Sequence, residues 1–356
     1  MRVLQSEYMY WAKNQPAARF PLSSSEVPAC HLDRFPITLA DLELDGRSRY
    51  RYLPLREAIG RRHGVGPEQV VLADGTSMAN MLAMAALITP GDEVLVEHPV
   101  YEPMVAAARF LGARIRTFER KAPEFALDPA AIEATLSSDT RLILLTNLHN
   151  PSSGLASTEA LQASAELAQR VGAHVLVDEV YRDATYPLQP SAVTLGDRFI
   201  VTSSLTKCYG LSGIRCGWII APPDLAERMW RLNELFGVAQ SHAAERLACV
   251  AFEHFDEIAR PLTDLLPRNR ALFNDWLKTR ADLDCALLTG GITAFPRLIG
   301  ASVDDLHRLL REEYETSIVP GAFFGAPDHF RVGMGSATEL VGEGLDRLGA
   351  ALDRLR

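Results

Sequence analysis

Short apolar segments alternate with amphipathic segments between about Val70 and Pro222, and this alternation constrains the fold more than any other feature of the sequence. The apolar segments have the length and composition of buried strands: VVLAD, EVLVE, RLILLTN, HVLVDEV, RFIVTSS and RCGWIIA. Segments with helical spacing lie between them, as in SMANMLAMAALI, near Val105 and in TEALQASAELAQRV. Because strands that alternate with helices form parallel sheets with helices on both faces, we predict a large α/β domain with a mostly parallel sheet.

The pattern changes from about Ala251 onward. Long helical segments now dominate, and short apolar stretches such as CALLT, TAFPRL and HFRVGMG separate them. This mixture predicts a smaller α+β domain. Residues 1 to about 40 show no clear periodicity, and we expect them to pack with the C-terminal part. The predicted division is therefore a large domain of residues 41–250 and a small domain of residues 1–40 and 251–356.

Composition narrows the class of protein. The 356 residues are 47% hydrophobic and 23% charged, which is typical of a globular protein. The net charge is −9 and no block of like charge occurs, so a nucleic-acid partner is not indicated. The five cysteines include no C-x-x-C pair, which argues against a disulfide framework and a zinc site. With no signal peptide and no apolar run of about 18 to 20 residues, we expect a cytoplasmic protein without a membrane partner.

One lysine stands at the end of a predicted strand. The stretch SSLTKCYGLSGIRCGW contains Lys207 and, eight residues later, Arg215. Open α/β sheets bind ligands at the carboxyl ends of their strands. A half-buried lysine there can lose its proton and act as a nucleophile. Taken alone, however, such a lysine is more often a solvated surface residue.

Other predicted strands also end in polar or aromatic residues. A run of small residues, Gly75, Thr76 and Ser77, opens the helix after VVLAD, where backbone N–H groups could cradle a phosphate or simply cap the helix. The remaining strand ends carry Tyr101, Asn150, Asp178 and Tyr181. An amine, a carboxylate, an arginine, a phosphate cradle and a flat aromatic are together the groups needed to hold pyridoxal 5′-phosphate. Each of them alone also fits an ordinary loop or an ion pair.

The chain resembles the fold type I pyridoxal-phosphate enzymes of the class I/II aminotransferase family. The segment SLTKCYGLSGIRCG is similar to the lysine signature of that family, and NPSSG to its N-P-x-x-G. The step from Asn150 to Asp178, followed by Tyr181, is also similar to the family pattern. The resemblance extends from about Tyr50 to Arg331.

This resemblance implies roles around the cofactor ring. Lys207 would form the internal aldimine with pyridoxal 5′-phosphate and later move a proton between Cα and C4′. Asp178 would pair with the pyridine nitrogen, because a protonated ring is the better electron sink. Asn150 and Tyr181 would hydrogen-bond the phenolic oxygen of the ring, and Tyr101 would stack on its face.

Two further groups follow from the same resemblance. The residues implied to hold the phosphate are Gly75, Thr76, Ser77, Ser204 and Arg215. Arg331 is implied to bind the α-carboxylate of the substrate together with Asn150. A guanidinium suits both tasks because its fork geometry matches carboxylates and phosphates. The apolar neighbours of Arg331 in HFRVGMG favour an inward, functional arginine over one on an exposed edge strand.

Several positions bear on the substrate and the neighbouring subunit. Three serines, Ser23, Ser24 and Ser25, stand where the family usually has a glycine-containing segment over the substrate. Glu234 would suit a cationic substrate side chain, although a solvated helix position is the more common explanation. The segment YRYLP is shorter than the usual tyrosine loop, so the sequence leaves open whether Tyr50 or Tyr52 reaches the phosphate of a neighbouring subunit.

The leading hypothesis is an aminotransferase that moves the amino group of an L-amino acid to a 2-oxo acid, as a homodimer. A lyase, decarboxylase or cyclase with the same cofactor is the alternative, because these reactions share their first steps. A non-catalytic regulatory relative is disfavoured, since no DNA-binding extension is present. A nucleotide-binding oxidoreductase is also disfavoured, because GTS lacks the G-x-G-x-x-G spacing. The sequence does not name the amino donor.

Overall fold

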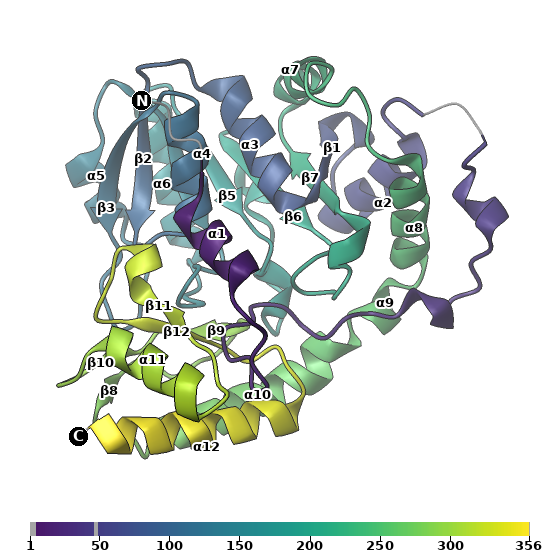
Figure 1. The fold of residues 1–356 in the computed structure, drawn as a ribbon. Helices are drawn as coiled ribbons and strands as arrows, with labels where there is room; N and C mark the ends of the chain where they lie inside the picture. Colours follow the sequence, from purple (N-terminus) through teal and green to yellow (C-terminus); the bar gives the residue numbers. More distant parts are fainter. Residues whose placement is uncertain (1–4, 46–48, 356) are drawn as a thin grey trace.

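A seven-stranded sheet forms the centre of the computed structural model, which describes residues 5–45 and 49–355 (Figure 1). The strand order across the sheet is β1-β7-β6-β5-β4-β2-β3. Neighbouring strands are parallel except at β7, which is antiparallel to both β1 and β6. The predicted mostly parallel sheet is therefore confirmed. Its strands are β1 (Val70–Asp74), β2 (Glu93–His98), β3 (Arg114–Glu119), β4 (Thr140–Thr146), β5 (His174–Asp178), β6 (Phe199–Ser204) and β7 (Cys216–Ile220).

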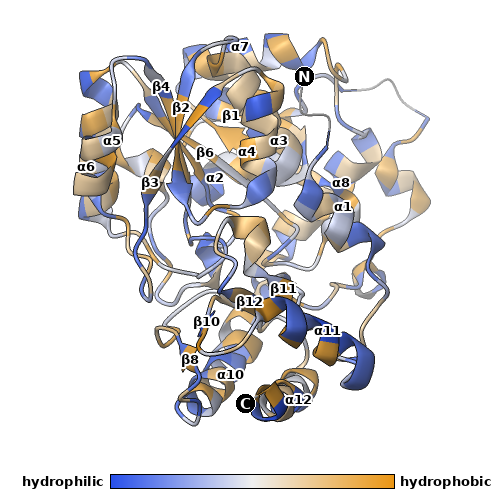
Figure 2. Cartoon of the chain, turned by 60° about the vertical axis from the view of Figure 1, so that its left-hand side comes forward, coloured by the Kyte–Doolittle hydropathy of each residue, from blue (hydrophilic) through white to orange (hydrophobic). Residues whose placement is uncertain are grey.

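Helices cover both faces of this sheet. Helices α5 and α6 lie on one face and α3 and α4 on the other, with apolar residues concentrated between these layers (Figure 2). Helix α7 packs against α3, and α2 and α8 pack together beside β1 and β7. The helix bounds are α2 (Leu53–His63), α3 (Gly75–Leu87), α4 (Glu102–Phe110), α5 (Pro129–Thr135), α6 (Thr158–Arg170), α7 (Pro223–Asn233) and α8 (His242–Glu253).

Burial on both faces explains why the central strands were recognisable from sequence. Strands β6 and β7 are buried along their whole length, so a continuous apolar run is required there. Strand β3 was not predicted. It lies at the edge of the sheet and pairs only with β2, and most of its side chains in RIRTFE are exposed or half-buried. An edge strand can remain polar, and its sequence therefore resembles a loop.

The C-terminal part packs three long helices against short strands (Figure 1). These helices are α10 (Arg260–Leu277), α11 (Val303–Glu313) and α12 (Thr338–Leu355), with the one-turn α9 (Phe255–Ile258) before them. Strand β12 (Phe330–Gly333) pairs with β11 (Val319–Pro320) and β9 (Thr293–Ala294), and β10 (Arg297–Leu298) pairs with β8 (Leu283–Asp284). The predicted strand CALLT is wrong, because the chain leaves the sheet after Asp284 and Leu287 is exposed. The predicted strand TAFPRL is interrupted at Pro296, which cannot donate a ladder hydrogen bond.

The N-terminal part contains a helix that the sequence did not signal. Helix α1 (Glu7–Asn14) begins after Ser6, whose hydroxyl accepts a hydrogen bond from the Met9 N–H at 3.2 Å. It lies beside α4, between the sheet and the C-terminal strands (Figure 1). Only Tyr8 is buried among its residues, so α1 has no broad apolar stripe to produce a helical pattern.

The buried apolar side chains form two main clusters. One surrounds the seven-stranded sheet, and the other lies among α10, α11, α12 and β12. The segment after α1 contributes Leu22 to the second cluster and Val27 and Phe35 to the first. It therefore passes from one cluster to the other. The division into residues 41–250 and residues 1–40 with 251–356 stays a prediction.

Candidate active site

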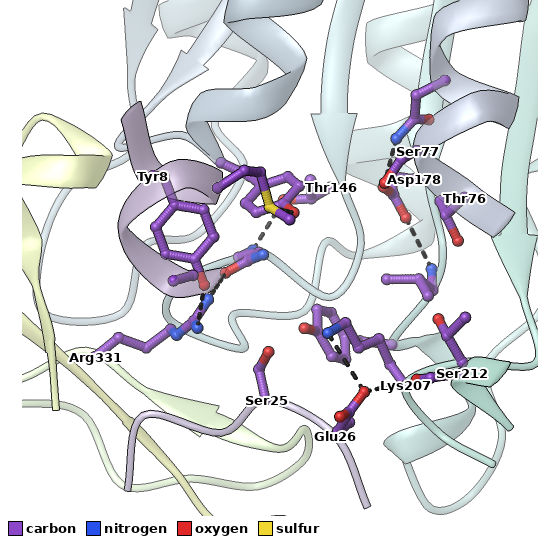
Figure 3. A pocket seen from close by; sticks show the side chains of 18 of the residues that line it. Tyr8, Ser25, Glu26, Thr76, Ser77, Thr146, Asp178, Lys207, Ser212 and Arg331 are labelled. Carbon is purple, nitrogen blue, oxygen red and sulfur yellow. Dashed lines mark hydrogen bonds and ion pairs between the residues drawn. The ribbon is translucent and has the colours of Figure 1, made fainter. Parts of the chain in front are cut away.

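A cavity of about 540 Å³ opens at the carboxyl ends of the strands (Figure 3). Most of the predicted site residues lie in its wall: Thr76, Ser77, Tyr101, Asn150, Asp178, Tyr181, Lys207, Arg215 and Arg331. Two predicted residues lie behind the wall. Gly75 is the first residue of α3, and the Ser204 hydroxyl accepts a hydrogen bond from the Thr76 hydroxyl at 2.7 Å.

Asp178 is a buried carboxylate held by neutral donors. The Asn80 amide donates to its Oδ2 at 2.8 Å, and the Val180 N–H donates to its Oδ1 at 3.0 Å. The Thr202 hydroxyl donates to Asn80 Oδ1 at 2.6 Å and so orients the amide. Burial raises the pKa of Asp178 to about 6. A carboxylate in this position would be stabilised by a cationic N–H group inside the cavity, which a protonated pyridine supplies.

The raised pKa makes the stability of the cofactor-free protein depend on pH. Asp178 binds its proton more tightly in the folded chain (pKa about 6) than in the unfolded chain (3.8), so folding stability falls as pH rises through this window. The shift corresponds to about 2 to 3 kcal/mol. We expect Asp178→Asn to be more stable relative to the wild type at pH 7 than at pH 4 by about this amount, as measured by urea unfolding. A stability difference that does not change with pH would contradict the raised pKa.

Lys207 lies in the loop after β6, with its side chain 32% exposed and its Nζ 3.7 Å from Glu26 Oε2. Neighbouring residues fix this loop. The backbone carbonyl of Lys207 accepts from the Val27 N–H at 3.0 Å, and the thiol of Cys208 donates to the Val180 carbonyl at 3.3 Å. The lysine loop is therefore tied to the segment after α1 on one side and to the loop after Asp178 on the other.

The residues at the start of α3 form an anion site with Arg215. Gly75 has a φ of +77°, which residues with a side chain rarely adopt, and a Cβ there would lie 2.3 Å from the present position of the Arg215 guanidinium. Arg215 itself adopts a left-handed φ of 58° and donates to the Asp74 carbonyl at 3.1 Å. No ion pair of Arg215 with an acidic side chain occurs among the described residues. A helix N-terminus, a guanidinium without an acidic partner among the described residues and the Thr76 hydroxyl fit a phosphate group.

Arg331 is a buried cation whose hydrogen-bond partners among the described residues are all neutral. It is 1% exposed, and it donates to Asn150 Oδ1 at 3.0 Å, to the Tyr8 hydroxyl at 2.8 Å and to the Ser23 carbonyl at 3.4 Å. Within residues 5–45 and 49–355, its Nε has no hydrogen-bond partner. A buried guanidinium at a cavity wall is stabilised by a carboxylate, and the structure leaves that position to a ligand.

Aromatic rings and a hydroxyl close the cavity around these charges. Tyr101 lies in the wall, with its ring edge-on to Tyr8 at a centroid distance of 5.7 Å. Tyr181 is buried, and burial raises the pKa of its hydroxyl, so that it stays protonated and able to donate. Ser25 lines the cavity near this hydroxyl. The site thus combines an anion cradle, a flat ring, hydrogen-bond donors and two buried charges of opposite sign.

Several residues in the cavity wall were not predicted from the sequence. Tyr8 belongs to α1, which had no helical signal, and Glu26 follows the three serines without any motif of its own. Asn80 did carry a signal, because it is a polar residue in the apolar face of SMANMLAMAALI. An asparagine in that setting needs a buried partner, and Asp178 is that partner.

Of the positions raised for the substrate and the neighbouring subunit, Ser25 lies in the cavity wall, whereas Glu234, Tyr50 and Tyr52 lie elsewhere. Glu234 is at the end of α7, outside the cavity wall, and accepts from the Tyr50 hydroxyl at 2.6 Å. Tyr52 is buried and accepts from Arg246 at 2.9 Å. Ser23 hydrogen-bonds Ser317 through its hydroxyl at 2.8 Å.

Over the described residues, His, Cys, Asp and Glu form no group of three or more that could hold a metal ion. No helix in those residues is both long and apolar enough to span a membrane.

A lysine, a buried aspartate and an anion cradle at the carboxyl edge of this sheet define a fold type I pyridoxal-phosphate enzyme, and the cavity fits that cofactor. Residues 37–348 match the family described as Aminotransferase class I and II. The chain belongs to that family, and its cofactor is pyridoxal 5′-phosphate.

Curated relatives with different names match most of the chain. Capreomycidine synthase from Streptomyces vinaceus is 33% identical over 286 residues, covering 78% of this chain and 73% of that protein. Aspartate aminotransferase from Streptomyces avermitilis is 25% identical over 343 residues, covering 88% and 84%. The chain is therefore similar both to a synthase and to aminotransferases.

The similar solved structures also include both a cyclase and an aminotransferase. A structure described as the PLP-dependent cyclase OrfR superposes with a TM-score of 0.85 at 26% identity, covering 98% of this chain and 96% of that one. A PLP-dependent aminotransferase from Streptococcus suis superposes with a TM-score of 0.92 at 23% identity, covering 100% and 99%. The second likeness concerns the fold alone.

Proposed function

We propose that this protein removes the Cα proton of an L-α-amino acid and transfers the amino group to a 2-oxo acid. The observation that carries the proposal is the buried guanidinium of Arg331, which faces the same cavity as Lys207 and Asp178 and has only neutral partners in the described part of the chain. An α-amino acid has the carboxylate that Arg331 lacks and the amine that reacts with the cofactor. The α-carboxylate and the α-amine of the substrate thus both have a partner in one cavity.

The residues around the cavity suit distinct parts of pyridoxal phosphate. Asp178 would hold the ring nitrogen, Asn150 and Tyr181 the phenolic oxygen, and Tyr101 the ring face. The phosphate would lie at the start of α3, against Thr76, Ser77 and Arg215. Gly75 allows the guanidinium of Arg215 to approach closely, and Ser204 orients Thr76 by a hydrogen bond. When bound, the cofactor stabilises the negative charge that forms at the substrate α-carbon.

The chain supplies proton transfer and orientation. Lys207 accepts the Cα proton and returns it, because it is the one lysine in the wall that lies at a strand end beside the cofactor position. Arg331 fixes the carboxylate and thereby selects which bond at Cα is broken. Tyr8 and Asn150 hold two guanidinium nitrogens of Arg331, so that it is oriented before the substrate arrives.

A reaction at Cβ, elimination or ring closure, is the second candidate function. It begins with the same loss of the Cα proton and needs the same cofactor residues. The similarity to Capreomycidine synthase, at 33% identity, and to the cyclase OrfR, at 26% identity, favours it specifically. The residues assigned above serve both reactions equally well.

A single-turnover experiment separates the two candidates. The loaded enzyme is mixed with each of the twenty amino acids and no oxo acid, and products are followed by absorbance and mass spectrometry. We expect one equivalent of 2-oxo acid and of pyridoxamine phosphate to form, after which the reaction stops. Continuous turnover that yields ammonia, water or a cyclic product, without pyridoxamine phosphate, would instead establish the Cβ reaction.

The homodimer implied by the family remains part of this proposal. Exposed apolar side chains support it: Leu39, Leu44, Leu53, Leu235 and Phe236 are 50% to 81% exposed. Two of the segments concerned are linked by the hydrogen bond from Tyr50 to Glu234. A second copy would cover these side chains.

A further inference from the structure

The segment from Ser23 to Glu26 runs along the cavity between its two substrate-binding ends. At one end, the Ser23 carbonyl accepts from Arg331 at 3.4 Å, and at the other the Glu26 carboxylate lies 3.7 Å from Lys207 Nζ (Figure 3). Backbone hydrogen bonds hold both ends, from Gly333 to the Leu22 carbonyl at 2.6 Å and from Val27 to the Lys207 carbonyl at 3.0 Å. A substrate bound between Arg331 and Lys207 must therefore lie along this segment.

The charges in the cavity wall show which group has no assigned partner. Arg331 is assigned to the substrate carboxylate, Arg215 to the phosphate, Asp178 to the ring nitrogen and Lys207 to the cofactor aldehyde. Among the described wall residues, this leaves Glu26 and Lys13. Lys13 is exposed on α1, whereas Glu26 points toward Lys207 at the reacting end of the cavity (Figure 3).

The proton transfer at Cα leaves Glu26 without a cationic partner. Lys207 is the only cation in an ion pair with Glu26 within the part of the chain described, and its amine must be neutral in order to accept the Cα proton. The hydroxyl of Ser212 donates to Glu26 Oε2 at 2.9 Å and keeps the carboxylate oriented. A negative charge thus remains beside the substrate, with one neutral hydrogen bond.

We propose that Glu26 binds a cationic group on the substrate side chain, so that the substrate is a basic L-amino acid carrying an ammonium or guanidinium group. The inference rests on the proposed function, because it needs Arg331 and Lys207 to hold the other two substrate groups. An acidic side chain would be repelled by Glu26, and an apolar one would leave the carboxylate without a counter-charge. This assignment places side-chain recognition in the segment after α1 and not at Glu234.

Binding of charge-matched ligands tests the assignment. The ligands are the α-methyl forms of lysine and norleucine and of arginine and citrulline, which have no Cα proton to lose. Their dissociation constants are measured on the loaded enzyme by titrating the cofactor absorbance. We expect the cationic member of each pair to bind about tenfold more tightly. A partly exposed hydrogen bond to a charged group strengthens binding by about this factor. In Glu26→Gln the preference for the cationic ligand should disappear, whereas the dissociation constant of α-methylnorleucine should be unchanged.

Glu234→Gln is the matched control, because Glu234 lies outside the cavity wall. Loss of the preference in Glu234→Gln but not in Glu26→Gln would overturn the assignment. Equal binding of cationic and neutral ligands to the wild type would also overturn it, while leaving the proposed function intact. If none of the ligands binds, including norleucine, the proposed function itself fails.

Discussion

Lys207→Ala should lower kcat by at least about 10³-fold, because no other group takes over the proton transfer at Cα. The variant should still bind the cofactor through Asp178 and the phosphate cradle, which do not involve the lysine. Borohydride treatment followed by peptide mass spectrometry should attach the cofactor to Lys207 in the wild type and to no residue in the variant.

The small number of lysines makes this result easy to interpret. The chain has four, Lys13, Lys121, Lys207 and Lys278, and of these only Lys13 and Lys207 line the cavity. Lys13→Ala is therefore the matched control and should retain both turnover and the covalent attachment. Attachment of the cofactor to Lys13 in the wild type would show that Lys207 has been wrongly assigned.

Arg331→Ala should lower kcat/KM by about 30- to 5000-fold, since truncation of one partner of a buried charge pair costs about 2 to 5 kcal/mol. Most of the loss should appear in KM, because the carboxylate is bound both before and during proton transfer. The cofactor absorbance should stay as in the wild type. Arg331→Lys should recover part of the loss, because it keeps the charge but not the fork.

The decarboxylated amine of a good substrate provides an independent check on Arg331. The wild type should strongly prefer the amino acid to the amine, and Arg331→Ala should lose most of that preference. Arg297→Ala, a half-exposed arginine on β10, is the control for general effects on the C-terminal part. If Arg331→Ala discriminates between acid and amine as well as the wild type does, Arg331 does not bind the carboxylate.

The candidate site was partly predictable because its polar residues follow buried strands directly. Asp178 ends β5, and Lys207 and Arg215 lie in the connection between β6 and β7. The carboxyl ends of parallel strands meet at one edge of a sheet, so residues at those ends come together whatever the strand order. Tyr8 and Glu26 lack this link, because they come from a segment whose path follows no repeating pattern.

The sequence by itself determined the large sheet, the helices that cover it and the strand ends that hold the site residues. Strands buried on both faces need continuous apolar runs, and such runs are recognisable in the sequence. Only the tertiary structure decided the strand order, the antiparallel direction of β7 and the edge strand β3. It also decided that Tyr8 meets Arg331, 323 residues away, and that Glu26 faces Lys207. Such contacts depend on how separate elements pack, and neither residue spacing nor local propensity encodes that packing.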